Sequence, residues 1–295
     1  MTHSERLLRV PETFRSLTGI TPDAFRSLLP RVEAAWLEAQ RKRRERPGRR
    51  RRPGAGPKPA LCVADQLLML LVYYRTYVTH AFLAFLFRID SGTVSRNIAR
   101  LEPLLAGIFR IPERRVEVKE DEVRELFFDG TERPTRRPEK RQRRHYSGKK
   151  KRHTLKNQII VVRKKKKPGR RKAGAGPEKR RQRVAGVSPT SPGKVHDKKM
   201  YDRARTLVPP GVRATGDTGY KGTALGTPTK KPRGGELTKR QKRGNARLSR
   251  RRIAVEHGIG KMKIWRIAGE RYRNPLRRHT LIIKNVAGLH NLVFA

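Results

Sequence analysis

The hydrophobic pattern of the first forty residues predicts helices. Thr21 is a favourable N-cap, because its hydroxyl oxygen can accept a hydrogen bond from the first turn, and Pro22 suits the first helical position. We therefore expect an N-terminal helical segment over residues 1–40. Its apolar positions at helical spacing are Phe25, Leu28, Leu29, Val32 and Trp36.

Apolar density rises sharply between residues 61 and 105, where the pattern divides into three helical pieces. Residues 65–77 are nearly all apolar on one side, which predicts a buried helix, and residues 81–87 predict a short second helix. Asp90 or Ser91 can cap the third helix. The apolar positions of that helix recur at steps of four, three and four, and they are Val94, Ile98, Leu101 and Leu105.

Three helices in this order predict a helix-turn-helix domain over residues 61–112. The N-terminal half of the third helix would enter the major groove of DNA. There an arginine can donate to guanine, an asparagine to adenine, and hydroxyl side chains can reach a phosphate or a thymine methyl. From this segment alone, an ordinary three-helix packing unit with a polar outer face remains a second interpretation. The candidate DNA contacts, expected to point away from the apolar face or to flank it, are Thr93, Ser95, Arg96, Asn97 and Arg100.

Beyond Pro112 the pattern changes to short apolar runs typical of strands. Strands alternating with helices predict a mixed α/β core over residues 113–295, preceded by the all-α domain. The expected strands are 123–130, 153–162, 183–189 and 212–220, and the expected helices are 196–208, 246–267 and 279–294.

Two basic stretches rich in proline or glycine interrupt these patterns. Residues 41–60 are expected to form a linker, and residues 163–182 a basic loop inserted between two strands. Neither composition can bury an apolar core, so both are candidates for contact with phosphates.

Charge indicates the partner. The 295 residues include 74 Lys and Arg against 25 Asp and Glu, for a net charge of +49. Nucleic acid is the expected partner, since each phosphate contact releases condensed counterions, but charge alone does not separate DNA from RNA. The single cysteine excludes an intramolecular disulfide and a cysteine-paired zinc site. The longest apolar run, residues 67–74, is shorter than the roughly 20 residues of a membrane-spanning helix, so we expect a soluble, cytoplasmic protein.

Three acids are unusual in so basic a chain because they lie at the ends of apolar elements or within them. Asp129 follows an apolar run and precedes a glycine, Asp217 follows the run 212–215, and Glu256 lies in a predicted helix beside Val255. Clustered carboxylates repel each other unless cations lie between them, and Mg²⁺ or Mn²⁺ prefers carboxylate oxygen. Each acid also has an ordinary interpretation, as a turn residue or as part of an ion pair.

An ordered set of motifs extends the argument. It resembles bacterial insertion-sequence transposases of the DDE superfamily, more narrowly the insertion-sequence-five group, which is related to Harbinger elements. The resemblance runs from about Phe14 to Leu292. The motifs that carry it are DGTERP (129–134), YSGKKKRHTLKNQ (146–158), SPGKVHDKK (191–199), GDTGY (216–220), KKPRGGELT (230–238) and VEHGIGKMK (255–263).

The resemblance implies an RNase H-like catalytic domain in which Asp129, Asp217 and Glu256 are the catalytic and metal-binding acids. It implies two Mg²⁺ (or Mn²⁺) ions per site, cleavage of DNA strands by water and joining of a 3′-hydroxyl to target DNA. The implied partners are double-stranded transposon ends and target DNA, bound by a homodimer or higher oligomer. Two other functions remain open: a domesticated, non-catalytic DNA-binding protein and a basic RNA-binding protein. Candidate phosphate contacts, equally interpretable as a solvated face, are Lys149, Lys150 and Arg152.

This chain departs from the family pattern at the long 163–182 insert and at two glycines after the third acid. Gly258 and Gly260 each weaken a helix by roughly 1 kcal/mol relative to alanine, which predicts a less firmly positioned Glu256. We interpret His196 and Asp197 as the start of a helix rather than as a pair of ligands.

Overall fold

The computed structural model describes residues 1–45, 59–116, 118, 123–164 and 182–294. They form two compact units, residues 1–110 with 264–269 and residues 111–263 with 270–295. Most of the expected basic linker (46–58) and of the inserted loop (165–181) lies outside the described residues. The predicted division of the chain into four segments, with boundaries near residues 40, 60 and 112, remains a prediction.

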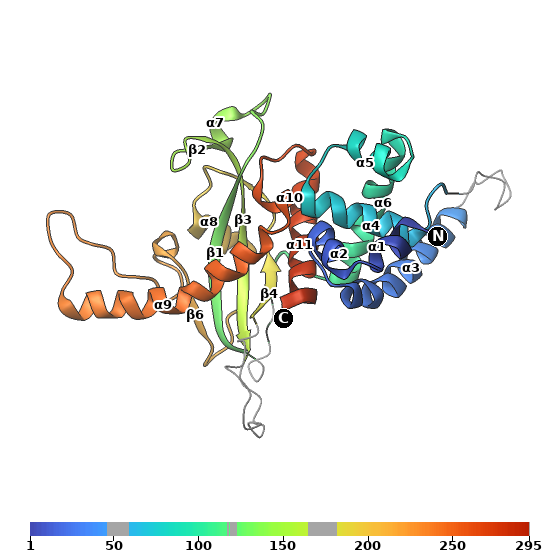
Figure 1. Ribbon diagram of the computed structural model, residues 1–295. Helices are drawn as coiled ribbons and strands as arrows, with labels where there is room; N and C mark the ends of the chain where they lie inside the picture. The colour runs from blue at the N-terminus through green and yellow to red at the C-terminus, as the bar shows by residue number, and fades with distance from the viewer. Residues whose placement is uncertain (46–58, 117, 119–122, 165–181, 295) are drawn as a thin grey trace, which may run out of the picture. The chain divides into compact units, whose positions relative to one another are not determined.

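The first unit is helical (Figure 1). Thr21 caps the third helix as predicted, accepting from the Ala24 amide at 3.2 Å. That helix continues to Arg44, four residues past the expected boundary, because Lys and Arg in a last turn favour the negative end of the helix dipole. The helices of this unit are α1 (His3–Leu8), α2 (Pro11–Thr18), α3 (Pro22–Arg44), α4 (Val63–Thr76), α5 (His80–Phe87), α6 (Ser91–Phe109) and α10 (Arg266–Gly269).

The core of the helical unit forms around α4, whose residues 65–74 are all buried, as the sequence predicts. Trp265, just before α10, is fully buried in the same unit and donates from Nε1 to the Thr18 carbonyl at 3.1 Å. Gly19 has a φ of +79° and lies against this indole, where a Cβ would come within 2.7 Å of Nε1. Trp265 is therefore a core residue of this unit.

Helix α6 confirms the predicted cap and apolar face. Asp90 accepts from the Thr93 amide at 2.7 Å, and the four apolar positions predicted to face inward are fully buried. The expectation for Asn97 was wrong, because this side chain is buried with 6% of its surface exposed. It lies three residues after Val94 and four before Leu101, and that spacing places it on the apolar side of the helix.

The second unit contains a mixed sheet with helices packed against it, which confirms the expected fold class. Within the described residues the main strand order is β2-β3-β1-β6, and β4 and β5 also pair with β3. Strand β1 is antiparallel to β3 and parallel to β6. The strands are β1 (Val123–Pro134), β2 (Tyr146–Ser147), β3 (Arg152–Lys164), β4 (Gln182–Val187), β5 (Ser191–Pro192) and β6 (Arg213–Thr215).

Several elements of this unit depart from their predicted bounds; for example, β1 continues to Pro134, past the expected end at residue 130, and α8 ends at Ala204 rather than at residue 208. Helix α9 begins at Lys239 rather than at residue 246, because Thr238 and Gln241 form a capping box, and it ends at Met262. The expected strand 212–220 ends at Thr215, since Asp217 instead caps a short 3₁₀ turn. The helices are α7 (Gln142–His145), α8 (Asp197–Ala204), η1 (Thr218–Tyr220), α9 (Lys239–Met262), η2 (Leu276–Arg278) and α11 (His279–Phe294).

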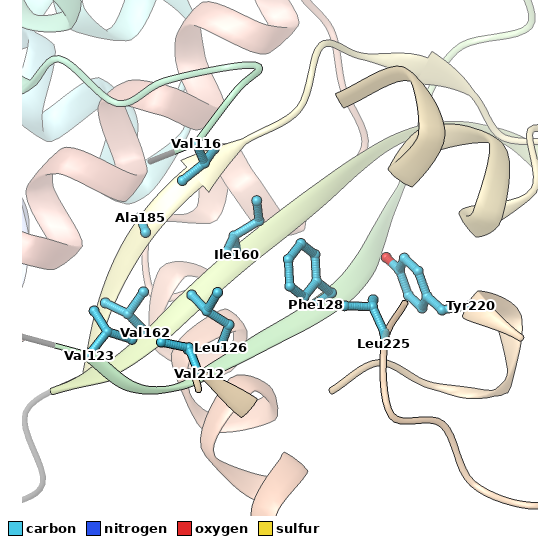
Figure 2. Packing of buried hydrophobic residues seen from close by; sticks show 10 residues of the cluster. All are labelled: Val116, Val123, Leu126, Phe128, Ile160, Val162, Ala185, Val212, Tyr220 and Leu225. Carbon is cyan, nitrogen blue, oxygen red and sulfur yellow. The ribbon is translucent and has the colours of Figure 1, made fainter. Parts of the chain in front are cut away.

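Strand β1 is buried on both faces, which explains its continuous apolar run. Leu126 and Phe128 point into the hydrophobic cluster of Figure 2, where the Phe128 ring lies 6.4 Å from that of Tyr220. The residues that alternate with them, Glu125 and Asp129, are contacted by arginines of α9. Figure 1 shows α9 crossing the sheet on this side. In the described part of the chain, no helix is both long and apolar enough to cross a membrane.

Candidate active site

Pairing of β1 with β6 brings two of the predicted acids to the same region. The parallel register matches Leu126 with Ala214 and Phe127 with Thr215. Asp129 and Asp217 each lie two residues beyond the last of these pairs. Because the two strands are parallel, residues that lie equally far beyond a matched pair stay close, so these acids, 88 positions apart in the sequence, become neighbours in space.

Asp129 is partly buried and has little compensation for its charge. Its Oδ1 accepts from the adjacent Gly130 amide at 2.9 Å, and an Arg252 nitrogen lies 3.8 Å away. Burial raises the pKa of Asp129 to about 6; Arg252 opposes this rise, whereas Asp217 and Asp197 add to it. A carboxylate in this setting gains strongly from a nearby cation, since desolvation and like charges both disfavour its ionised form.

Asp217 is held by its local backbone. It is the N-cap of η1, and its Oδ1 accepts from the Gly219 amide at 2.9 Å. One carboxylate oxygen is thereby oriented by a short turn rather than by a flexible side chain alone.

Glu256 stands apart from this pair. It lies on α9 one turn beyond Arg252, whose side chain reaches Asp129, but the Glu256 side chain itself is exposed. Among the described residues, no group of three His, Cys, Asp or Glu side chains is arranged to hold a metal ion. The structure therefore brings Asp129 and Asp217 together and leaves Glu256 about one helical turn, roughly 5.4 Å along the axis, beyond Arg252.

The two glycines after Glu256 do not interrupt α9. The helix runs through both of them to Met262. Gly258 faces Val161 of β3, where a Cβ would lie 3.4 Å from a valine methyl, so this glycine permits close packing of helix on sheet.

Asp197 is a residue at this site that the sequence interpretation missed. It does begin α8, with His196 as the N-cap, as predicted. Its carboxylate also lies against Gly130 and Gly219, the glycines that follow the two paired acids. The signal was present in the sequence, because the string that contains His196 and Asp197 belongs to the ordered motif set.

The donor atoms at this site are of the chemical type that binds a hard divalent cation. Carboxylate oxygens are the ligands that Mg²⁺ and Mn²⁺ prefer. Asp129 is only partly neutralised, and the side chain of Tyr220 is fully buried with a hydroxyl that has no hydrogen-bond partner among the described residues. The partly neutralised charge of Asp129 indicates that a cation could be accommodated beside it.

The candidate DNA contacts fall into two groups. On α6, Arg96 and Arg100 are exposed and Thr93 and Ser95 are partly exposed, whereas Asn97 is buried. The Arg96 guanidinium is oriented by the Thr93 hydroxyl at 2.7 Å. In the second unit, the exposed candidates are Lys149 and Lys150, in the turn between β2 and β3, and Arg152, the first residue of β3.

The first half of α9 is a basic surface that the sequence interpretation also missed, because it placed the start of this helix at residue 246. Asn245 exchanges two hydrogen bonds with the backbone of Thr229, at 2.8 and 2.9 Å, and so ties the preceding loop to the helix. The exposed cations of this surface are Lys239, Arg240, Lys242, Arg243, Arg247 and Arg250.

Comparison with known families agrees with this architecture. A family profile described as the helix-turn-helix of DDE superfamily endonuclease matches residues 59–110, and one described as DDE superfamily endonuclease matches residues 179–291. Residues 59–110 are thus similar to that helix-turn-helix and residues 179–291 to that endonuclease, in this order along the chain. The mixed sheet with its helices is consistent with the RNase H-like core of that superfamily.

One relative extends the match over nearly the whole chain. The sequence is 29% identical over 296 residues to a protein of Microchaete diplosiphon named probable transposase for insertion sequence element IS702. The alignment covers 96% of this chain and 94% of the relative. The resemblance to insertion-sequence transposases expected from the motifs is thereby confirmed. No solved structure matches the chain significantly.

Proposed function

We propose that this protein is a transposase that binds the terminal inverted repeats of a mobile element and catalyses metal-dependent DNA cleavage and strand transfer. Asp129, Asp217 and Glu256 are the proposed catalytic and metal-binding acids. The observation that carries the proposal is the parallel pairing of β1 with β6, which makes Asp129 and Asp217 neighbours. The whole-length similarity to a probable insertion-sequence transposase supports the same function.

The proposed chemistry divides between the acids and the cations they would hold. When bound, two Mg²⁺ or Mn²⁺ ions activate the attacking oxygen and stabilise the leaving oxygen in phosphoryl transfer. Asp129 and Asp217 would hold these ions from a strand and from a strand-end turn, both rigid elements. Arg252, which lies near Asp129, offsets part of the site's negative charge before the ions bind.

DNA binding is assigned to separate basic surfaces. In the helical unit, α6 is the proposed recognition helix, with Arg96 and Arg100 exposed on it. In the sheet unit, the first half of α9 and the turn at residues 149–152 supply cations for phosphates. Asn97 is left out of the proposal, because it is buried. We further propose that the protein acts in the bacterial cytoplasm as a homodimer or higher oligomer on DNA.

Cleavage of a duplex that carries the element's own end tests the catalytic proposal. The substrate is a duplex that carries any inverted repeat found beside the reading frame. With Mg²⁺ or Mn²⁺ the parent protein should nick it, and Asp129→Ala, Asp217→Ala and Glu256→Ala should each lower the rate at least ~100-fold. Even changes to groups that only hydrogen-bond to metal ligands cost about 10- to 100-fold. Asp202→Ala, on the exposed face of α8, is the matched control. Parental rates in all three variants would refute the assignment.

DNA binding is tested separately by titration with specific and random duplexes. Arg96→Ala should weaken binding to the specific duplex by about 1–3 kcal/mol and relax its sequence preference. The double variant of Lys149 and Lys150 to Ala should weaken both duplexes equally and make binding less dependent on salt. Arg26→Ala, an exposed cation of the helical unit paired with Asp23, is the control. A uniform effect of Arg96→Ala on both duplexes would show that this residue contacts only phosphate.

A second function, a domesticated and non-catalytic DNA-binding protein, is favoured by one observation. Glu256 is exposed, and among the described residues no three acids are grouped so that they could hold a metal ion. This alternative expects specific DNA binding without metal and no cleavage of any end-containing duplex. The cleavage experiment therefore separates the two functions directly.

A further inference from the structure

A groove in the sheet unit is lined almost entirely by arginines. It lies between the first half of α9 and the end of β3, and its volume is about 500 Å³. Guanidinium groups gathered around one open space repel each other, so the groove is suited to an anion that would lie among them. The residues that line it are Arg163, Arg243, Ala246, Arg247, Arg250 and Arg251.

The four arginines that α9 contributes lie on one face of the helix. They follow each other at steps of four, three and one residues, which places them within an arc of about 100°. Further along the same face, Gly258 packs against Val161 of β3. An amphipathic helix would continue this face with apolar residues, but here the contact with the sheet gives way to a row of arginines.

One buried acid fixes two of the five arginines. Glu125 of β1 is the cross-strand neighbour of Arg163, and their side chains, 7% and 13% exposed, form an ion pair at 2.5 Å. The Arg163 Cζ also lies 5.0 Å from the centre of the Phe127 ring. The other carboxylate oxygen of Glu125 lies 3.7 Å from Nε of Arg251. A single carboxylate thus orients guanidinium groups from a strand and from a helix, and the groove keeps a net positive charge.

The groove lies on the same face of the sheet as Asp129. Glu125 and Asp129 are four residues apart on β1, so both side chains point to one face and are separated by about 13 Å along the strand. Helix α9 contacts both acids, through Arg251 and Arg252. A DNA strand that runs along this face can place one phosphate among the arginines and another near Asp129.

We propose that this arginine groove is a discrete binding site for a DNA phosphate and that Glu125 is its positioning residue. The planar guanidinium fork presents paired donors that match two phosphate oxygens, and it does so best when the side chain is already oriented. This inference deepens the proposed function, because it assumes that the sheet unit binds DNA, but it requires neither metal nor cleavage. The competing interpretation is a diffuse basic surface to which every exposed cation of α9 contributes alike.

Titration of the full chain with a labelled random-sequence duplex, without divalent metal and at several NaCl concentrations, tests the groove. The double variant Arg247→Gln, Arg250→Gln should weaken binding roughly 10-fold near 0.1 M salt and lower the salt slope by about 1, because one phosphate contact is lost. The control is the double variant Lys242→Gln, Arg26→Gln. It removes two exposed cations, each paired with an acid and neither in the groove, and should leave the salt slope unchanged.

A charge-conserving change tests whether the guanidinium group itself matters. Arg251→Lys keeps the charge but loses the planar fork, so it should weaken binding of the same duplex. Arg26→Lys is the control and should have no effect. A diffuse surface would tolerate both changes equally.

Glu125→Gln separates positioning from simple charge. Removal of a carboxylate makes the groove more positive, so Coulomb attraction alone predicts tighter binding of the duplex. Loss of positioning predicts the opposite, weaker binding, because Arg163 and Arg251 lose the acid that orients them. Thermal unfolding shows whether the variant is folded; if it is not, Arg251→Lys decides the question of orientation.

The outcomes separate the inference from the proposed function. If the groove double variant loses no more affinity than the control double variant, the discrete site is overturned while DNA binding by the basic surfaces stands. If folded Glu125→Gln binds the duplex as tightly as the parent or more tightly, the positioning role is overturned. Absence of duplex binding by the parent protein would overturn the proposed function itself.

Discussion

Each unit of the protein shields an aspartate from solvent, fully in the helical unit and partly in the sheet unit, and the surroundings of the two carboxylates differ. In the helical unit, Asp65 is 4% exposed and accepts from the backbone amides of His3 and Ser4, at 3.2 and 2.7 Å. In the sheet unit, Asp129 accepts from one amide, that of the next residue, and its arginine neighbour is 3.8 Å away.

The difference teaches how a structural acid can be told from a functional one. Backbone amides at the start of α1 are unpaired within their helix, so Asp65 satisfies them and is satisfied in return. Asp129 lies instead within β1 near other carboxylates, and among the described residues the one backbone amide that donates to it is that of Gly130. Its burial costs stability, and the uncompensated charge is what a cation would neutralise. The comparison predicts that removing each charge has opposite consequences.

The largest expected effect is on catalysis. Asp129→Asn keeps the shape of the side chain but removes its charge, so DNA cleavage should fall at least ~100-fold, whereas Asp65→Asn should lower the rate less than about threefold at a temperature where it is folded. Single-turnover cleavage of an end-containing duplex measures both. Equal losses in the two variants would remove the distinction between the acids.

The next effect is on the stability of the helical unit. Asp65→Ala leaves one buried and one partly buried amide of α1 without an acceptor and should lower the free energy of unfolding by about 2–3 kcal/mol. Urea unfolding followed by circular dichroism measures it. Asp23→Ala is the control, because that side chain is 91% exposed, and it should change stability by no more than about 0.5 kcal/mol. A loss below that level in Asp65→Ala would show that the amides find other partners.

A somewhat smaller effect should appear in the pH dependence of stability. Because the pKa of Asp129 is raised to about 6 in the folded protein, its ionised form destabilises the fold above that pH, and the penalty disappears as pH falls from 6 to about 4. Asp129→Asn should therefore raise the free energy of unfolding by about 2 kcal/mol at pH 8 and leave it unchanged near pH 4. Metal-free unfolding curves at both pH values measure this. A gain that is independent of pH would contradict the assignment to charge.

The smallest effect concerns buried histidines, which should show the reverse trend. Burial lowers the pKa of His279 to about 3 and that of His290 to about 4. Both are neutral in the folded protein but gain a proton on unfolding, so their contribution is complete well above pH 6.5 and is lost as pH falls toward these values. Each histidine should lower the free energy of unfolding by about 1 kcal/mol as the pH falls from 7.5 to 6. His290→Leu should flatten this dependence, and an unchanged slope would refute it.

Local chemistry explains what could be predicted from the amino acids. Thr21 and Asp90 act as N-caps because capping needs only a side-chain oxygen and the next turn of backbone. The buried helix α4 and helix α11, whose bounds match the prediction, follow from apolar content and periodicity. Asp129 and Asp217 were identified as candidates from their positions at the ends of apolar runs and from motif resemblance. These signals all act over a few residues.

Contacts between distant segments determined the features that could not be predicted from the sequence. Asn97 is buried because the packing of α6 uses a wider face than its apolar residues mark. Asp197 joins the acid site because α8 packs where two glycines leave room, and Lys156 reaches it from a strand about forty residues earlier. Sequence order determines which side chains exist and which helices and turns they favour. Strand register and helix packing determine which charges share a volume, since that depends on the balance of burial and repulsion across the whole unit.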